Sequence, residues 1–351
     1  MINDYLKKVA ARESLSEQEA YQCMQDIINT RNSRLQVASL LTALSVKGET
    51  VTEITGFVKA MREVSLKVQS HHKNLVDTCG TGGDALKTFN ISTASALIAA
   101  SCGVAIAKHG NRSITSKCGG ADILEALGVN INCNPQEVKN CLDNAGMGFM
   151  FAPLFHPAMG TVASLRKELG IRTVFNILGP LTSPANADIQ LLGVFDPDYV
   201  KPLAQVLKNL KVKKAMVVHG FDSKANPAMD EISTLGQTRV ALLQGGQVEV
   251  FEICPEDFGI KKTIEDYIAA PISLKENLEI FNGVINGRSD NLRDESRLNL
   301  CLVNAAAILF LAGKVGSFEK GVEVAYASVQ EGCALNKLNE FIQISNEKIE
   351  A

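Results

Sequence analysis

A glycine-rich stretch between two aspartates, DTCGTGGD at residues 77–84, is the first segment that could do chemistry. It follows the apolar pair Leu75 and Val76, which predicts that the glycines come directly after a strand. Such glycines let the backbone approach a ligand closely, and successive N–H groups can then hold phosphate oxygens. The spacing matches neither the Rossmann nor the Walker loop, so alone it could equally be an ordinary turn.

Two further segments carry side chains that suit an anion. Where a helix is expected to begin, four polar residues could bind phosphate or simply cap the helix, namely Thr88, Asn90, Ser92 and Thr93. After an apolar strand come seven polar side chains within nine residues: Lys108, His109, Asn111, Arg112, Ser113, Thr115 and Ser116. Ligands bind at the carboxyl ends of strands in open α/β sheets, so these segments together predict a phosphate site.

Two adjacent carboxylates, Asp230 and Glu231, follow another apolar strand and a polar loop. A surface turn is the ordinary explanation of such a pair. A polyphosphate, however, needs a partner for its charge, and magnesium held by one or two carboxylates is the usual one. The phosphate site therefore predicts a magnesium site at these two residues.

Composition limits the classes of function. With 46% apolar residues the 351-residue chain can fill a core, and a net charge of -3 provides no basic excess for nucleic-acid binding. The nine cysteines are odd in number, scattered and never in C-x-x-C spacing, which argues against disulfides and a zinc site. The N-terminus is polar, and the apolar run 300–313 is shorter than the roughly 20 residues that cross a bilayer. We expect a reduced, cytoplasmic protein without a membrane span.

The first seventy residues carry helical signals. Ser16 with Glu19 and Thr50 with Glu53 form capping boxes, and residues 65–74 are a polar linker. An apolar face for helix packing is expected from Ile27, Leu35, Val37, Leu40, Leu41, Leu44 and Val46.

After the linker, short β-rich runs at 74–80, 103–110, 189–195 and 214–220 alternate with helical stretches, which predicts an α/β fold with a largely parallel sheet. Residues 155–182 interrupt this alternation with helical spacing and no strand. We expect this segment to return to the N-terminal helices, with a hinge beside the site. The predicted domains are a small one of residues 1–70 with the return segment 155–182, and a large one of residues 71–154 and 183–351.

The motifs resemble those of one family. The segments DTCGTGGD, NIST, KHGNRS, ADILEALG, FAPLFHPAM, LGIRTVFNILGPL with its following SPA, and DEIS have the order and spacing of the anthranilate phosphoribosyltransferases. The match runs from about residue 75 to 233, and both ends of the chain are compatible with it. The resemblance implies a small all-helical domain, a large α/β domain with a mostly parallel sheet, and a homodimer formed through the helical domain. It also implies phosphoribosyl transfer from phosphoribosyl pyrophosphate to the amine of anthranilate, with two magnesium ions.

The resemblance also implies site residues. The contacts of phosphoribosyl pyrophosphate would be Gly80, Gly83, Asp84, Thr88, Asn90, Ile91, Ser92, Thr93, Lys108, His109, Gly110, Asn111, Arg112, Ser113, Ile114, Thr115, Ser116 and Gly120. Anthranilate would contact Gly80, Asn111 and Arg166, and magnesium would be held by Ser92, Asp230 and Glu231.

These assignments suit the chemistry. Displacement at an anomeric carbon passes through an oxocarbenium-like state, and stabilising the departing pyrophosphate helps it most. Lys108, Asp230 and Glu231 would support that transition state. Anthranilate's amine already carries its lone pair at neutral pH, so no residue is assigned as a general acid or base. His109 is expected to position groups, and the planar fork of Arg166 suits the anthranilate carboxylate.

The chain departs from the family at three places. Gly120 stands where many relatives have serine, the loop 220–233 is longer than the usual G-x-D-G-L-D-E form, and Ala85 and Ser164 replace a glycine and a proline. Two alternatives remain. A pyrimidine nucleoside phosphorylase would carry K-x-S-x-G-R where this chain has KHGNRS, and a non-catalytic polyanion binder should have a basic face and lose Asp230, Glu231 or Arg166.

Overall fold

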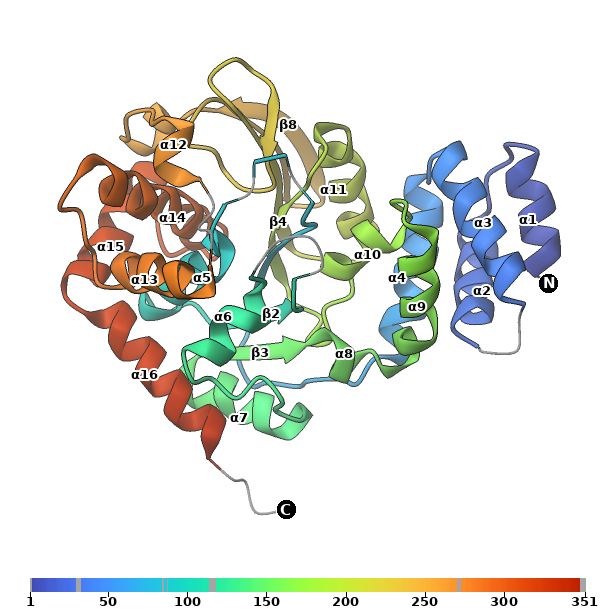
Figure 1. Cartoon of the computed structure of the whole chain (residues 1–351), viewed down its shortest axis with the longest axis horizontal. Helices are drawn as coiled ribbons and strands as arrows, with labels where there is room; N and C mark the ends of the chain where they lie inside the picture. Colours follow the sequence, from blue (N-terminus) through green and yellow to red (C-terminus); the bar gives the residue numbers. More distant parts are fainter. Residues whose placement is uncertain are drawn as a thin grey trace.

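The computed structural model describes residues 2–29, 33–83, 85–86, 88–113, 118–269 and 273–347. A small helical domain lies at one end of the molecule, and a larger α/β domain forms the rest (Figure 1). The predicted fold class is therefore confirmed. Among the described helices, none is long and apolar enough to cross a membrane.

The small domain begins with four helices, which are α1 (Ile2–Ala10), α2 (Glu17–Ile28), α3 (Arg34–Lys47) and α4 (Val51–Val64). Both predicted capping boxes are present, at the starts of α2 and α4. Glu53, the acidic member of the second box, is fully buried and accepts from Leu15 N at 2.9 Å and Lys47 Nζ at 2.9 Å. Removing one partner would leave the other charge buried, at a cost of about 3–5 kcal/mol.

The predicted apolar face of the helical domain is only partly correct. Ile27, Val37, Leu40, Leu41 and Leu44 are buried, but Leu35 and Val46 are 80% and 74% exposed. These two side chains lie on the outer side of α3, because a helix of this length presents residues to all sides and only one stripe can face the bundle.

The sheet of the α/β domain has the strand order β3-β2-β1-β4-β5-β7-β8. The strands are β1 (Val76–Gly80), β2 (Ile106–Gly110), β3 (Met147–Phe151), β4 (Ile189–Gly193), β5 (Lys214–Phe221), β6 (Pro227–Met229), β7 (Thr238–Gln244) and β8 (Gln247–Ile253). Pairing is parallel from β3 to β5 and antiparallel for β6, β7 and β8. The predicted, largely parallel sheet thus ends in an antiparallel hairpin.

Helices cover both faces of the sheet. One face packs on the central helices α5 (Ile91–Ser101) and α14 (Leu292–Leu311), and the other packs on α11 (Val200–Asn209). Further helices around the first layer are α6 (Gly120–Ala126), α7 (Pro135–Ala145), α12 (Glu265–Ile268), α13 (Leu274–Ile285), α15 (Phe318–Gln330) and α16 (Cys333–Asn346). The apolar run 300–313 is mostly the buried end of α14, as predicted. The hydrophobic core of the helical domain continues through α11 onto the sheet.

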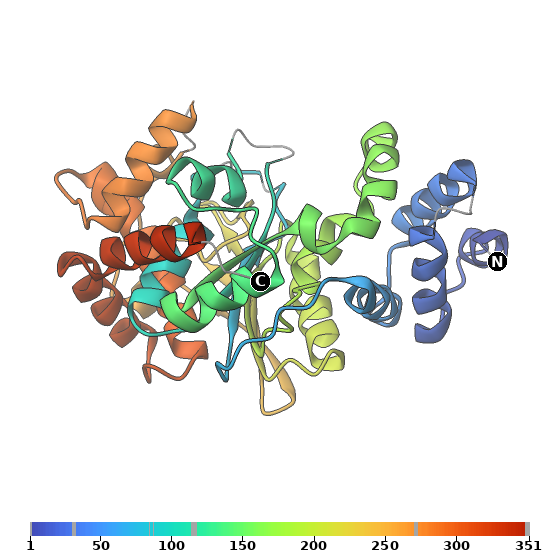
Figure 2. The same cartoon turned by 90° about the horizontal axis from the view of Figure 1, so that it is seen from below.

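The return segment forms α8 (Ala152–Phe155), α9 (Gly160–Leu169) and α10 (Phe175–Leu181), without a strand, as expected. Helix α9 packs against α2 and α3, and α10 packs against α4 (Figure 2). The linker 65–74 runs beside this crossing, since Leu66 N donates to Phe155 O at 3.0 Å and Val68 N to Pro184 O at 3.3 Å. The linker is therefore hydrogen-bonded to the chain at both ends of the return segment.

Candidate active site

The glycine-rich loop and the acidic pair meet at the carboxyl ends of β1, β4 and β5. Gly82 N donates to Asp230 Oδ2 at 2.8 Å. A Cβ on Gly80 would lie 2.0 Å from that oxygen, and one on Gly193 would lie 1.6 Å from the Asp230 carbonyl oxygen. The loop therefore needs glycine partly because the Asp230 backbone and carboxylate occupy the space that a side chain would fill.

The lengthened loop before the acidic pair is an ordered hairpin. Strands β5 and β6 pair across a turn in which Asp222 accepts hydrogen bonds from Lys224 N and Asn226 N at 2.7 and 2.8 Å. Beyond the pair, Ile232 N donates to Asn304 Oδ1 at 3.0 Å. The extra residues are taken up in the turn, and Asp230 is held from both sides.

The electrostatics of the acidic pair suit a cation. Asp230 is half-buried, and burial raises the pKa of its carboxyl group despite the hydrogen bond from Gly82 N. Glu231 is half-buried beside it. A hard cation with oxygen ligands, such as magnesium, would compensate this charge.

Lys108 is the buried cation on the other side of the glycine loop. It is 3% exposed, and its Nζ donates to Thr78 O at 2.6 Å and to Ser92 Oγ at 3.2 Å. Gly120 lies beside it, since a Cβ there would be 3.8 Å from Lys108 Cε and 3.4 Å from Thr93 Oγ1. Four predicted residues therefore lie close together. They are Lys108 on β2, Ser92 and Thr93 in the first turn of α5, and Gly120 at the start of α6.

The helix start at Asn90 does not use its side chain as a cap. Asn90 Nδ2 donates to Cys118 O at 3.3 Å, while Oδ1 is buried without a hydrogen-bond partner among the described residues. The capping alternative is therefore not realised at this residue, which leaves the first turn of α5 open to a ligand.

Arg112 and Ser113, which follow β2, are held by acidic side chains of α6. Arg112 donates to both oxygens of Glu125 and to Asp122 Oδ1 at 2.7–2.9 Å, so its guanidinium is engaged within the protein. Asp122 Oδ2 accepts from Ser113 N and Gly119 N at 3.1 and 2.8 Å. The structure thus places the Arg112 side chain against α6, and phosphate contacts of this segment would have to come from other groups or from a rearranged guanidinium.

Three buried titratable residues lie beneath the site. His109 N donates to Asp77 Oδ1 at 3.1 Å, and the rings of His109 and His156 are 5.1 Å apart. Burial raises the pKa of Asp77 to about 6 and lowers that of His156 to about 4. Burial and the neighbouring imidazole lower the pKa of His109 to about 3. Both imidazoles are therefore neutral and only weakly basic at pH 7, which suits positioning rather than proton transfer.

Arg166 lies on α9, in the return segment. It is half-buried, its guanidinium carbon is 5.4 Å from the Phe175 ring centroid, and burial lowers its pKa. A desolvated guanidinium held against an aromatic ring is suited to a planar carboxylate.

Arg172 is a residue that the sequence reasoning missed. Its guanidinium donates to Gly83 O and lies 4.0 Å from the Phe195 ring centroid, while its own carbonyl accepts from Ser45 Oγ at 2.9 Å. Arg172 therefore links the helical domain to the glycine-rich loop. The available signal was a charged side chain inside the otherwise apolar motif LGIRTVF.

The remaining predicted residues fall into two groups. Near the strand ends and α5 lie Gly80, Gly83, Thr88, Ile91, Gly110 and Asn111. Outside the described residues lie Asp84, Ile114, Thr115 and Ser116.

Comparisons with known proteins agree on one family. The helical bundle domain of the glycosyl transferase family matches residues 3–65, and the a/b domain of that family matches residues 72–335. Anthranilate phosphoribosyltransferase of Methanothermobacter thermautotrophicus is 51% identical over 94% of both chains. The Methanosphaera stadtmanae enzyme of the same name is 44% identical over 99% of this chain and 100% of its own.

Solved structures agree with the sequences. The structure of anthranilate phosphoribosyltransferase from Thermus thermophilus superposes with a TM-score of 0.89 at 38% identity, covering 98% of this chain and 100% of the other. The Saccharomyces cerevisiae enzyme in complex with phosphoribosyl pyrophosphate and magnesium gives a TM-score of 0.87 at 29% identity, covering 98% and 97%. The chain therefore belongs to the anthranilate phosphoribosyltransferase family and carries out its reaction, phosphoribosyl transfer to the amine of anthranilate in tryptophan biosynthesis.

Proposed function

We propose that phosphoribosyl pyrophosphate binds at the carboxyl ends of β1 and β2, with its pyrophosphate at the glycine-rich loop. The observation that carries this proposal is the hydrogen bond from Gly82 N to Asp230 Oδ2 at 2.8 Å, which joins the loop to the acidic pair. Lys108, 3.2 Å from Ser92 Oγ, supplies positive charge on the opposite side. Further phosphate contacts come from the predicted residues of α5 and of the segment after β2.

Magnesium would be held by Asp230, Glu231 and Ser92, as two ions. The carboxylate of Asp230 supports this assignment, because it is half-buried and burial raises its pKa, so a bound cation would stabilise its negative charge. When bound, magnesium would neutralise the pyrophosphate oxygens and so stabilise their departure. The protein's own part is to hold the acidic pair against the loop and to keep Lys108 buried, where its charge acts most strongly on the anion.

Anthranilate would bind between the glycine-rich loop and α9, with Arg166 on its carboxylate and Gly80 and Asn111 beside it. The lowered pKa values of His109 and His156 support a reaction without an acid or base residue, since at pH 7 neither is a protonated acid, and imidazoles with pKa values of about 3 and 4 are weak bases. The amine then attacks the anomeric carbon as pyrophosphate leaves, and its proton passes to solvent.

The test is the loss of anthranilate fluorescence when phosphoribosyl pyrophosphate and magnesium are added to purified protein. A loss of fluorescence that requires the protein, phosphoribosyl pyrophosphate and magnesium supports the proposal. No loss at any magnesium concentration contradicts it. Phosphorolysis of thymidine by the same preparation, without use of phosphoribosyl pyrophosphate, would favour the nucleoside phosphorylase alternative.

We also propose that residues 1–70 and the return segment 155–182 move as one body against residues 71–154 and 183–351. The packing of α9 and α10 on α2, α3 and α4 supports this division. Closure of this kind would bring Arg166 toward the strand ends. Free cysteines at all nine positions are compatible with a cytoplasmic location.

A homodimer through the helical domain is supported by the outer side of α3. Leu35 is 80% and Val46 74% exposed, beside a groove of about 530 Å³ between α1 and α3. Light scattering of the wild-type protein should give the mass of a dimer, and Val46→Lys should give a monomer because a charge would enter the interface. A monomeric wild-type protein would contradict this proposal.

A further inference from the structure

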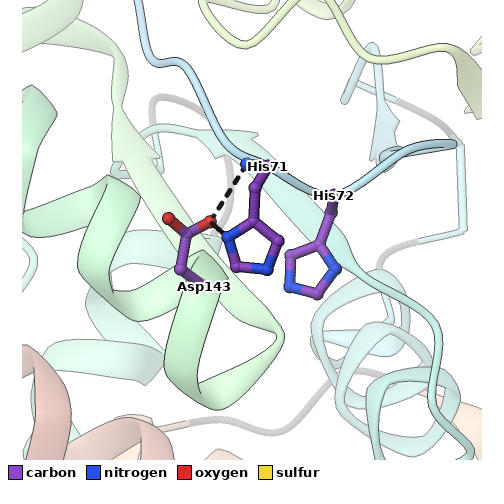
Figure 3. A group of neighbouring side chains, drawn as sticks. All are labelled: His71, His72 and Asp143. Carbon is purple, nitrogen blue, oxygen red and sulfur yellow. Dashed lines mark hydrogen bonds and ion pairs between the residues drawn. The ribbon is translucent and has the colours of Figure 1, made fainter.

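A cluster of metal-ligating side chains lies on the linker between the domains, outside the residues assigned to the active site. His71 and His72 come from the middle of the linker, and Asp143 comes from the last turns of α7 (Figure 3). One ligand atom from each residue lies within 4.8 Å of the others. His71 Nδ1 and Asp143 Oδ1 are 3.0 Å apart.

The donor set points to a particular class of ion. Two imidazoles and one carboxylate suit Zn²⁺, Ni²⁺ or Cu²⁺, whereas magnesium prefers oxygen ligands alone. Around a four-coordinate ion with bonds of about 2.0–2.1 Å, neighbouring ligand atoms are roughly 3.3 Å apart. The separation of 3.0 Å between His71 Nδ1 and Asp143 Oδ1 is close to that value. The ring of His71 can turn to complete the site because its side chain is 64% exposed.

Surrounding groups hold two of the ligands in place. His72 Nε2 lies 3.0 Å from Leu142 O and faces the His71 ring (Figure 3), so a metal ion bound by this nitrogen would replace its contact with the carbonyl. That carbonyl belongs to the last turn of α7, where the helix dipole favours a cation. Ser70 Oγ donates to Asp143 Oδ1 at 2.6 Å and fixes the carboxylate.

Lys139 opposes a metal ion. Its Nζ is 2.5 Å from Asp143 Oδ2. Lys139, Ser70 and the backbone of His71 all donate to the Asp143 carboxylate. The same ammonium group repels a divalent cation, so the metal affinity should rise when Lys139 loses its charge.

We propose that His71, His72 and Asp143 form a second metal site that takes a divalent transition-metal ion of the zinc class and fastens the linker to α7. The linker is already hydrogen-bonded at Leu66, at Val68 and at Asn74, whose N donates to Asp188 Oδ2 at 3.1 Å. The ion holds the middle of this segment, which joins the helical domain to β1.

The test is calorimetric titration of the full-length protein with Zn²⁺ in the presence of excess Mg²⁺. One saturable site is expected, weakened at least tenfold by His72→Asn and by Asp143→Asn and strengthened by Lys139→Gln. Glu323→Gln, a surface change on α15, is the matched control and should bind as the wild type does. No saturable binding, or equal binding by wild type and His72→Asn, would overturn the proposal.

Cobalt distinguishes this site from the free thiols. Co²⁺ bound by imidazole and carboxylate lacks the intense near-ultraviolet absorption of thiolate ligation, so wild-type protein with one equivalent should show only weak visible bands, lost in His72→Asn. A thiolate band from that first equivalent would overturn the assignment. Zn²⁺ should also slow amide hydrogen exchange in residues 66–75, and unchanged exchange at saturation would refute the fastening of the linker.

Discussion

The two sides of the active site are held in different ways. On the α/β side, Asp230 and Lys108 are fixed by hydrogen bonds to backbone groups of neighbouring strand ends, at 2.8 and 2.6 Å. On the side of the return segment, Arg166 lies over an aromatic ring at 5.4 Å, and Arg172 combines a ring contact at 4.0 Å with a hydrogen bond to Gly83 O. A hydrogen bond to the backbone fixes the direction and distance of a side chain, whereas a guanidinium over a ring face can shift parallel to the ring.

This difference fits the division of labour in a two-substrate reaction. The proposed pyrophosphate side must be preformed, because charge stabilisation is strongest when its groups need no reorganisation. The proposed anthranilate side has to admit a second substrate, which a tolerant contact allows. Variants of each side should therefore differ in both size and kind of effect.

The largest effect is expected from Asp230→Asn. Asparagine can still accept from Gly82 N, so the loop should keep its shape while the charge for magnesium is lost. We expect kcat/KM to fall on the order of 10²–10³-fold, the scale of losing one group that stabilises developing charge. Steady-state kinetics over a range of magnesium concentrations measure it. A fall of less than tenfold would mean that the preformed side does not depend on this carboxylate, and Glu323→Gln is the control.

Arg166→Ala should act on one substrate only. A charge-assisted contact contributes about 1.5–3 kcal/mol, so the KM of anthranilate should rise about 10- to 100-fold. Binding of phosphoribosyl pyrophosphate, measured by calorimetry without anthranilate, should be largely kept. Equal damage to both substrates would contradict the separation of the two sides.

A smaller effect is expected from Arg172→Ala, because its hydrogen bond to Gly83 O and its ring contact lie at an exposed position. A loss of about 1 kcal/mol corresponds to roughly a fivefold rise in the KM of phosphoribosyl pyrophosphate, with kcat little changed. Arg172→Lys keeps the charge without the planar stack and should be intermediate. A fall in kcat alone would show that Arg172 acts on the reaction rather than on the loop.

The buried residues between the two sides predict how stability depends on pH. Between about pH 4 and 6.5 the unfolded chain binds protons on His109 and His156 that the folded chain does not, so stability falls with acidification. Asp77, with its pKa raised to about 6, has the opposite effect. As the pH falls toward 4 the folded chain binds a proton on Asp77 that the unfolded chain does not, which raises stability. Among these three groups the two histidines outweigh the aspartate, so their combined contribution to stability falls by roughly 1.4 kcal/mol per pH unit.

His156→Gln should flatten this pH dependence. The proton that His109 binds in the unfolded chain is then balanced by the proton that Asp77 binds in the folded chain. Denaturant unfolding at several pH values between 4 and 6 measures the slope, and Lys201→Gln, a change at an exposed position of α11, is the control. A slope equal to that of the wild type would mean that His156 titrates normally in the folded protein.

The sequence predicted the local features best. The capping boxes at Ser16 and Thr50 were predictable because both partners lie three residues apart. The hairpin of β7 and β8 was missed although Gly245-Gly246 between two β-rich runs is a local signal for it, whereas the antiparallel pairing of β7 with β5 has no local signal. The exposure of Leu35 could not be predicted either, because it depends on which stripe of α3 the other helices cover.

The site shows the same limit. Polar residues at strand ends predicted that Lys108 and Ser92 would meet, because parallel strands end at one edge. Nothing local indicated that Arg172 would reach Gly83, since 89 residues separate them and the contact depends on how the return segment packs.

The smallest effect is expected from Gly120→Ser, which restores the residue common in the family. A Cβ there meets Thr93 Oγ1 at 3.4 Å and Lys108 Cε at 3.8 Å, so the side chain fits without displacing its neighbours. Its hydroxyl would add one contact on the preformed side, worth about 0.5 kcal/mol or roughly a twofold lower KM for phosphoribosyl pyrophosphate. Gly120→Ala supplies the Cβ without the hydroxyl and should leave KM unchanged. If both variants raise KM equally, the preformed side has no room for a further group, and the glycine at this position is required by packing around Lys108.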